Sequence, residues 1–116
     1  MIRGSSSRDV RRTDGEPTIE TVFELLANRQ RRYALHCLSG SRGPLSVTDL
    51  ARRIERRDPR DSASSRMERK TALRHCHLPK LRAANVVDYD PDTGQVRPRS
   101  ELTRLEPFLE LARAEE

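Results

Sequence analysis

Residues 73–81 constrain the fold of this chain more than any other stretch. Their sequence, Leu-Arg-His-Cys-His-Leu-Pro-Lys-Leu, places three leucines on a helix among basic and imidazole side chains. Two valines and the turn sequence Asp-Pro-Asp-Thr-Gly at residues 90–94 follow, and such a turn is typical of a β-hairpin. A basic helix followed by a short hairpin is the order found in a winged helix-turn-helix unit. We therefore predict a mainly α-helical fold with one small β-hairpin.

Three further helices are predicted before this stretch, with N-caps at Thr18, Asn28 and Ser46. The first should bury Ile19, Val22, Phe23 and Leu26. The second should bury Tyr33, Ala34, Cys37 and Leu38 and keep Arg29, Arg31 and Arg32 in water. The third should bury Val47, Leu50, Ala51 and Ile54.

The long basic helix is predicted over residues 67–84. Pro79 is expected to kink it, and Asn85 suits the left-handed residue that closes it. Residues 56–65, which precede the helix, lack apolar periodicity and are expected to form a loop.

Short strands are predicted at residues 86–89 and 95–98, with a third short strand at Leu45. A C-terminal helix follows, and Pro107 either kinks it or lies in its first turn. Its apolar side chains are Leu102, Leu105, Leu109 and Ala112. They suggest a homodimer interface, and the alternative is that the leucines only cover the first helix.

Composition bounds the class of protein. Hydrophobic residues make up 34% of the 116 residues, which allows one domain with a small core. No window approaches the roughly eighteen apolar residues that cross a membrane, so a cytoplasmic protein with both cysteines reduced is expected.

Positive charge is concentrated in the middle of the chain. The net charge is +5, yet residues 52–82 contain eleven Lys or Arg against four Asp or Glu. Nucleic acid is therefore the first partner to consider, and the alternative is that the arginines are merely solvated.

A helical wheel assigns roles along the long helix. Leu73, His77, Leu81 and Ala84 fall on the inward side. The candidates for contacts with base edges are Arg69, Thr71, Ala72, His75 and Cys76. Four basic residues are candidates for phosphate contacts, namely Lys70, Arg74, Arg97 and Arg99. The acidic hairpin tip at residues 88–92 indicates that the wing skirts the duplex rather than entering it.

Four segments carry a family resemblance: residues 22–35, 46–51, 75–81 and 86–92. The most specific is His-Cys-His-Leu-Pro-Lys-Leu at residues 75–81. Together they resemble an archaeal winged-helix domain family, mostly uncharacterised and related to arsenic-repressor-like regulators. The resemblance covers residues 18–98. It implies a winged-helix fold, a role in transcriptional regulation and no catalytic residues.

The histidines and cysteines are candidates for a metal site. His36, Cys37, His75, Cys76 and His77 could ligate zinc, but His75 and His77 should point about 160° apart on a helix. We expect His77 and Cys37 to face inward and His75 to be exposed, with no metal and no cofactor. The chain also lacks a phosphate-binding glycine loop and a nucleophile elbow, so no enzyme is expected.

The sequence thus predicts a disordered basic arm at residues 1–17, a winged helix-turn-helix domain at 18–98 and a C-terminal helix at 99–116 for packing or dimerisation. The predicted function is a transcriptional regulator that binds duplex DNA through the 67–84 helix. The alternative is a winged-helix module for protein–protein interaction without direct DNA binding.

Overall fold

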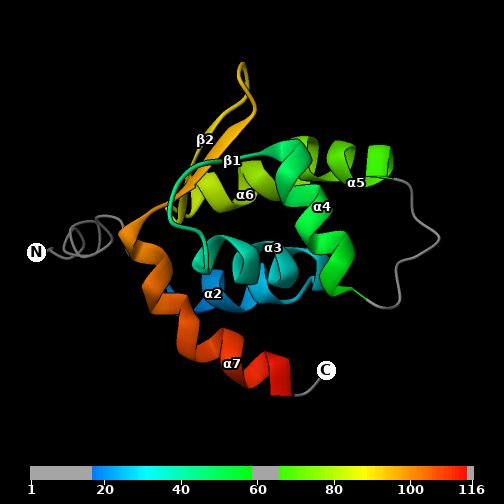
Figure 1. Ribbon diagram of the computed structural model, residues 1–116. Coiled ribbons are helices and arrows are strands. Elements are labelled where there is room, and N and C mark those ends of the chain that lie inside the picture. The colour runs from blue at the N-terminus through cyan, green and yellow to red at the C-terminus, as the bar shows by residue number, and fades with distance from the viewer. Residues whose placement is uncertain (1–16, 59–65, 115–116) are drawn as a thin grey trace, which may run out of the picture.

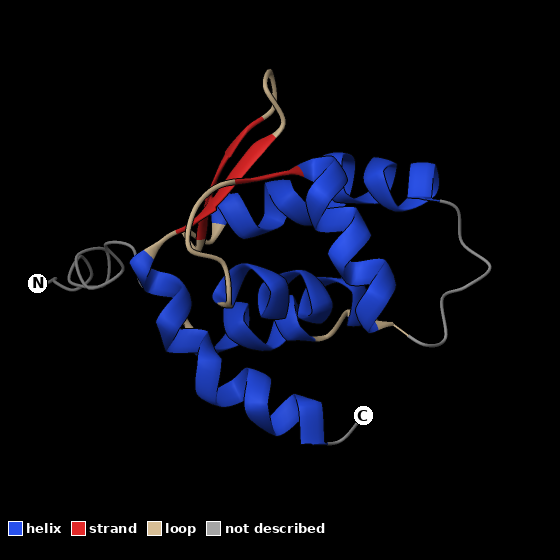
Figure 2. Cartoon of the chain, in the orientation of Figure 1, coloured by secondary structure: helices blue, strands red, loops and turns tan. Residues whose placement is uncertain are grey.

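The computed structural model describes residues 17–58 and 66–114. This part of the chain is mainly helical and contains a small three-stranded antiparallel sheet, as Figures 1 and 2 show. The predicted mainly α-helical class with a β-hairpin is confirmed. The predicted arm, apart from its last residue, and residues 59–65 of the predicted loop lie outside the described residues.

The first two described helices are α2 (Ile19–Leu26) and α3 (Arg29–Ser39), and both predicted N-caps are confirmed. Thr18 Oγ1 accepts from the Thr21 amide at 3.1 Å, and Asn28 Oδ1 accepts from the Arg31 amide at 3.1 Å. The predicted buried face of α2 is partly wrong. Its buried stripe runs through Val22 and Leu25, which leaves Ile19 and Phe23 on the exposed side of the helix.

Helix α3 buries Ala34, Cys37 and Leu38 as predicted, but the prediction that Arg31 lies in water is wrong. Arg31 Nε donates to the Leu25 carbonyl at 3.0 Å, and its NH2 group donates to the Glu24 carbonyl at 2.9 Å. Both carbonyls lie at the end of α2, where the regular helical hydrogen bonds run out, and the Glu24 carbonyl also accepts from the Ala27 amide at 3.3 Å. The buried guanidinium supplies further hydrogen bonds to this helix end. Arg31 therefore joins α2 to α3.

Helix α4 (Val47–Arg57) follows the two-residue strand β1 (Leu45–Ser46). Ser46 Oγ accepts from the Asp49 amide at 3.0 Å, and all four predicted core residues of α4 are buried. Arg56 and Arg57, predicted to begin a loop, form the last turn of this helix instead.

The long basic helix begins and ends close to the predicted bounds, but its middle is not an α-helix. It consists of α5 (Arg66–Ala72), the π-helical turn η1 (Leu73–His77) and α6 (Leu78–Ala83). Pro79 has no amide hydrogen, and in an α-helix its ring would collide with the His75 carbonyl. The wider π turn just before Pro79 accommodates the ring. Asn85 then closes the helix with φ 65°, as predicted.

Strands β2 (Val87–Asp90) and β3 (Gln95–Pro98) form a hairpin that projects from the helices in Figure 1. Strand β2 starts one residue later than predicted. Strand β3 lies between β1 and β2, with Leu45 opposite Val96. Gly94 has φ 75° at the turn, and its carbonyl accepts from the Val47 amide at 2.9 Å, which ties the hairpin to the start of α4.

The C-terminal region is a 3₁₀ helix, η2 (Ser100–Leu105), followed by α7 (Glu106–Ala114). Pro107 lies in the first turn of α7, one of its two predicted positions. Leu102, Leu105 and Leu109 are buried in the core of the chain, where η2 and α7 pack against α3. No helix in the described part of the chain is both long and apolar enough to cross a membrane.

Candidate nucleic-acid interface

The long helix has one side in the core and one side in water. Leu73, His77, Leu78 and Leu81 are buried, in agreement with the inward positions predicted for three of them. The solvent side carries five of the predicted site residues, all exposed or partly exposed: Lys70, Thr71, Arg74, His75 and Cys76. Ala72 is partly buried. The helix therefore brings most of the predicted base and phosphate contacts onto one surface.

Arg69 does not belong to this surface, so its prediction as a base contact is corrected. Only 4% of the residue is exposed. Arg69 precedes Leu73 by four residues and therefore lies on the same side of the helix, where α5 packs against α4. A buried guanidinium cannot reach a base edge without leaving the core.

Lys70 and Arg74 present charge that no carboxylate of residues 17–58 or 66–114 offsets. In the described part of the chain, neither side chain forms an ion pair with an Asp or Glu. Each lies on the solvent side of the helix, four residues from the other, so the two charges reinforce each other over one turn. This unbalanced pair makes the surface attractive to an anion.

The two predicted arginines of the hairpin region, Arg97 and Arg99, have acidic residues beside them. Arg99 NH1 lies 3.1 Å from Asp88 Oδ1, and Arg99 Nε lies 3.3 Å from Glu101 Oε1. Hydrogen bonds to Asp88 and then Glu101 raise the pKa of Arg99. Arg97 is exposed and stands opposite Asp88 in the strand register. Arg97 and Arg99 therefore have acidic neighbours, and they do not form a second pair of unbalanced charges like Lys70 and Arg74.

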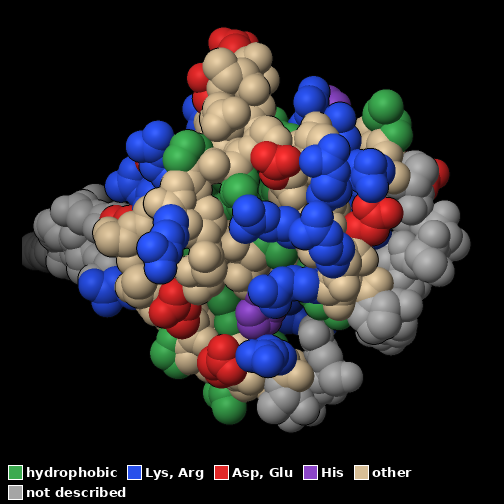
Figure 3. Space-filling view, viewed as in Figure 1, with side chains coloured by type: hydrophobic (Ala, Val, Ile, Leu, Met, Phe, Trp, Pro, Cys, Tyr) green, Lys and Arg blue, Asp and Glu red, His purple; other side chains and the backbone are tan. Residues whose placement is uncertain are grey.

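A basic surface on α4 was not assigned to the site by sequence reasoning. Four exposed arginines lie along this helix: Arg52, Arg53, Arg56 and Arg57. Figure 3 shows Lys and Arg side chains gathered over α4 and α5, whereas acidic side chains mark the tip of the hairpin. The signal was available, because positions i, i+1, i+4 and i+5 share one side of a helix.

The two histidines of the long helix lie on opposite sides, as predicted. His75 is exposed, whereas His77 is buried with Nδ1 3.4 Å from Arg31 NH1. Arginine can only donate, so Nδ1 of His77 accepts and the imidazole is neutral. Burial, with the charges of Arg31 and Lys80, lowers the pKa of His77 to about 4. Within the described ranges, no three His, Cys, Asp or Glu residues are grouped to hold a metal.

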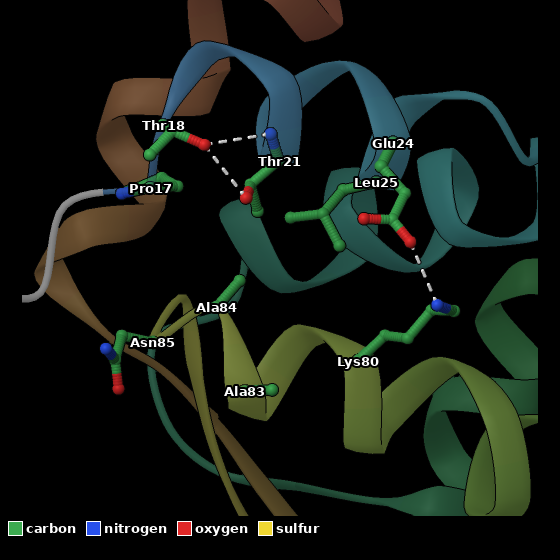
Figure 4. Close-up of a pocket in the computed structure, with 9 residues that line it drawn as sticks. All are labelled: Pro17, Thr18, Thr21, Glu24, Leu25, Lys80, Ala83, Ala84 and Asn85. Atoms are coloured by element: carbon green, nitrogen blue, oxygen red, sulfur yellow. Dashed lines mark hydrogen bonds and ion pairs between the residues drawn. The ribbon is translucent and has the colours of Figure 1, made fainter. Parts of the chain in front are cut away.

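A cavity of about 350 Å³ separates the start of α2 from the end of α6. Figure 4 shows Lys80 reaching across it to Glu24, and the two side chains form an ion pair at 3.0 Å. Thr18 is occupied as the cap of α2. Lys80 and Glu24 thus join the two helices. Their charges balance each other, unlike those of Lys70 and Arg74.

Comparison with known proteins places this chain in a family. No curated protein and no solved structure matches the chain. Residues 23–97 match a family described as a domain of unknown function (DUF7344), and this segment runs from α2 to the end of the hairpin. It includes the long helix and the solvent-facing residues described above. The chain belongs to the DUF7344 family.

Proposed function

We propose that this chain is a winged-helix transcriptional regulator that binds duplex DNA through the α5–η1–α6 helix. In this proposal α4 and the long helix form the helix-turn-helix pair, and the β2–β3 hairpin is the wing. The order of these elements and the projecting hairpin support the winged-helix assignment. The relation to arsenic-repressor-like regulators is part of the same proposal.

The observation that carries the proposal is the unbalanced charge of Lys70 and Arg74. The two cations lie on the solvent side of the helix beside the polar groups of Thr71, His75 and Cys76. Phosphate contacts supply most of the affinity for DNA, whereas side chains such as these read base edges in the major groove. We assign Lys70 and Arg74 to phosphate, and Thr71, His75 and Cys76 to base edges.

The hairpin has a smaller part in this proposal. Arg97 is the hairpin residue available to contact a phosphate, because Arg99 already pairs with two carboxylates. The acidic tip, with Asp90 and Asp92, would be repelled by a DNA backbone. The wing therefore lies beside the duplex and does not enter its minor groove.

A homodimer would let two copies read two half-sites. The three leucines considered for this contact are buried within one copy. Leu111 of α7, which is 68% exposed, remains as an apolar side chain that a second copy would cover. We propose a dimer contact at Leu111, and Leu111→Glu should shift a dimer to a monomer in light scattering without unfolding it.

The alternative function is a winged-helix module that binds another protein and not DNA. Exposed Phe23 and Ile19 on α2 favour it, because large apolar side chains in water often mark an interaction surface.

Duplex binding as a function of salt tests the proposal. A fluorescent duplex should bind the full chain at low ionic strength, and the affinity should fall steeply as salt rises. The double variant Lys70→Ala/Arg74→Ala should bind at least about tenfold more weakly and lower the salt slope by about 2. Arg113→Ala is the matched control, since Arg113 is an exposed arginine of α7 that pairs with Glu110 at 3.5 Å. If the wild-type chain shows no salt-sensitive binding, the interaction module replaces the DNA-binding proposal.

A further inference from the structure

The far end of α4 carries a second cationic site. Three of its arginines, Arg53, Arg56 and Arg57, line a cavity of about 300 Å³ together with Cys37 and Gly40 of the α3 end. The start of α4 is bonded to the hairpin through Val47, and Arg57 lies ten residues further on. At 1.5 Å per residue, Arg53 and Arg57 are about 9 and 15 Å along the helix from the hairpin contact.

No carboxylate in the described part of the chain offsets these three charges. Among the described residues, Arg53, Arg56 and Arg57 form no ion pair with an acidic side chain. The nearest acidic residues in the sequence form ion pairs with other arginines. Glu55 pairs with Arg66 at 2.9 Å, and buried Asp58 lies 3.5 Å from Arg29 Nε. Three like charges around one opening repel one another unless an anion joins them.

The base of the cavity does not repel an anion either. Gly40 has no side chain, and Cys37 is buried. Burial raises the pKa of the Cys37 thiol, and the nearby charges of Arg57 and Arg53 offset that shift only in part. The thiol is therefore neutral at physiological pH and offers a weak S–H donor rather than a negative charge.

We propose that Arg53, Arg56 and Arg57 form a binding site for a phosphate group, separate from the surface of Lys70 and Arg74. A guanidinium presents a planar fork that matches two phosphate oxygens, and three forks around one opening can surround a phosphate. The cavity is larger than one phosphate requires, so a phosphate ester or a diphosphate fits as well. The phosphate belongs either to a small molecule or to a nucleic-acid backbone.

Titration with inorganic pyrophosphate at constant ionic strength tests this site. Binding to the full chain is measured by calorimetry, and the Nε–H signals of the arginines are followed by NMR. The wild-type chain should bind one pyrophosphate and shift the signals of the three arginines. Arg53→Gln/Arg57→Gln should weaken binding about tenfold or more, because two charge-assisted forks are lost. The affinity of Arg57→Lys should lie between those of the wild type and the double variant, since lysine keeps the charge but lacks the planar fork.

Arg52→Gln is the matched control. Arg52 is an exposed arginine of the same helix, but it pairs with Asp49 at 3.3 Å and does not line the cavity. Its substitution should leave pyrophosphate affinity unchanged within about twofold. Melting temperatures of all variants show whether the fold is retained, and exposed arginine side chains should tolerate these changes.

A second arm repeats the measurement with duplex DNA to identify the source of the phosphate. If Arg53→Gln/Arg57→Gln weakens pyrophosphate binding alone, the site takes a small phosphate ligand. If it weakens duplex binding, the site holds a backbone phosphate. If the double variant binds both probes as the wild type does, the site does not exist. Lys70→Ala/Arg74→Ala should leave pyrophosphate binding intact. The DNA-binding proposal and the phosphate-site proposal can therefore fail independently, the first in duplex binding and the second in pyrophosphate binding.

Discussion

The long helix and the hairpin are built alike but differ in how their charges are balanced. Each buries one side and exposes the other: Leu81 and Val96 are fully buried, whereas Arg74 and Arg97 are in water. On the helix, Lys70 and Arg74 have no carboxylate partner among the described residues. At the hairpin, Asp88 stands opposite Arg97 and pairs with Arg99 at 3.1 Å. A count of arginines therefore does not identify an anion-binding surface unless the acids beside them are also counted.

The buried side of the long helix should give the largest effect. Leu81 is fully buried, and Leu81→Ala should lower the free energy of unfolding by about 2–5 kcal/mol, through lost burial and the cavity that remains. Urea denaturation measures the change. Arg82→Ala, the neighbouring exposed position, should change stability by less than about 0.5 kcal/mol. Equal losses at both positions would mean that the helix does not have a core side and a water side.

His77 should make stability depend on pH. Its pKa is about 4 in the folded chain and about 6.5 when unfolded, so only the unfolded chain gains this proton between those values. Stability from this group is complete above about pH 6.5 and is lost as pH falls towards 4, by at most about 3 kcal/mol. His77→Gln should remove this part of the pH dependence. Parallel stability curves for the two proteins from pH 7 to 4 would contradict the low pKa.

The sequence predicted the elements well and the turn of the long helix poorly. Caps, positive-φ residues and apolar spacing are local signals, so Ser46, Asn85 and the core of α4 were found. At about 100° per residue, a regular α-helix would turn Leu78 about 60° beyond Leu81, outside the inward side. The π turn before Pro79 winds the chain more slowly and brings Leu78 into the core.

The missed features of the candidate site depend on tertiary contacts. Arg31 and Arg69 look like solvent residues in sequence, but α2 and α4 pack against their positions and bury them. The pairing of Arg99 with Asp88 joins residues eleven apart and follows from the strand register. Neither periodicity nor charge counting contains this information.

Single substitutions should separate the helix from the hairpin in DNA binding. Arg74→Gln should weaken duplex affinity by about tenfold at low salt, because an unbalanced phosphate contact is lost. Arg97→Gln should weaken it by about twofold, because Asp88 opposite Arg97 already reduces the local field. Fluorescence anisotropy with one duplex measures both. A larger loss at Arg97 would reverse the comparison and make the hairpin the main contact.

The smallest effect should come from making the hairpin resemble the helix. Asp88 pairs with Arg99 and also stands opposite Arg97. Asp88→Asn therefore removes a negative charge from beside both arginines. Both arginines then face the duplex with less opposing charge, and affinity at low salt should rise by about two- to threefold. Glu110→Gln is the matched control, because it removes the same charge from the exposed pair with Arg113 on α7. If both substitutions raise affinity equally, the gain comes from net charge and the hairpin does not lie beside the duplex. If only Asp88→Asn raises affinity, the hairpin lies near the DNA backbone, and its carboxylates weaken binding.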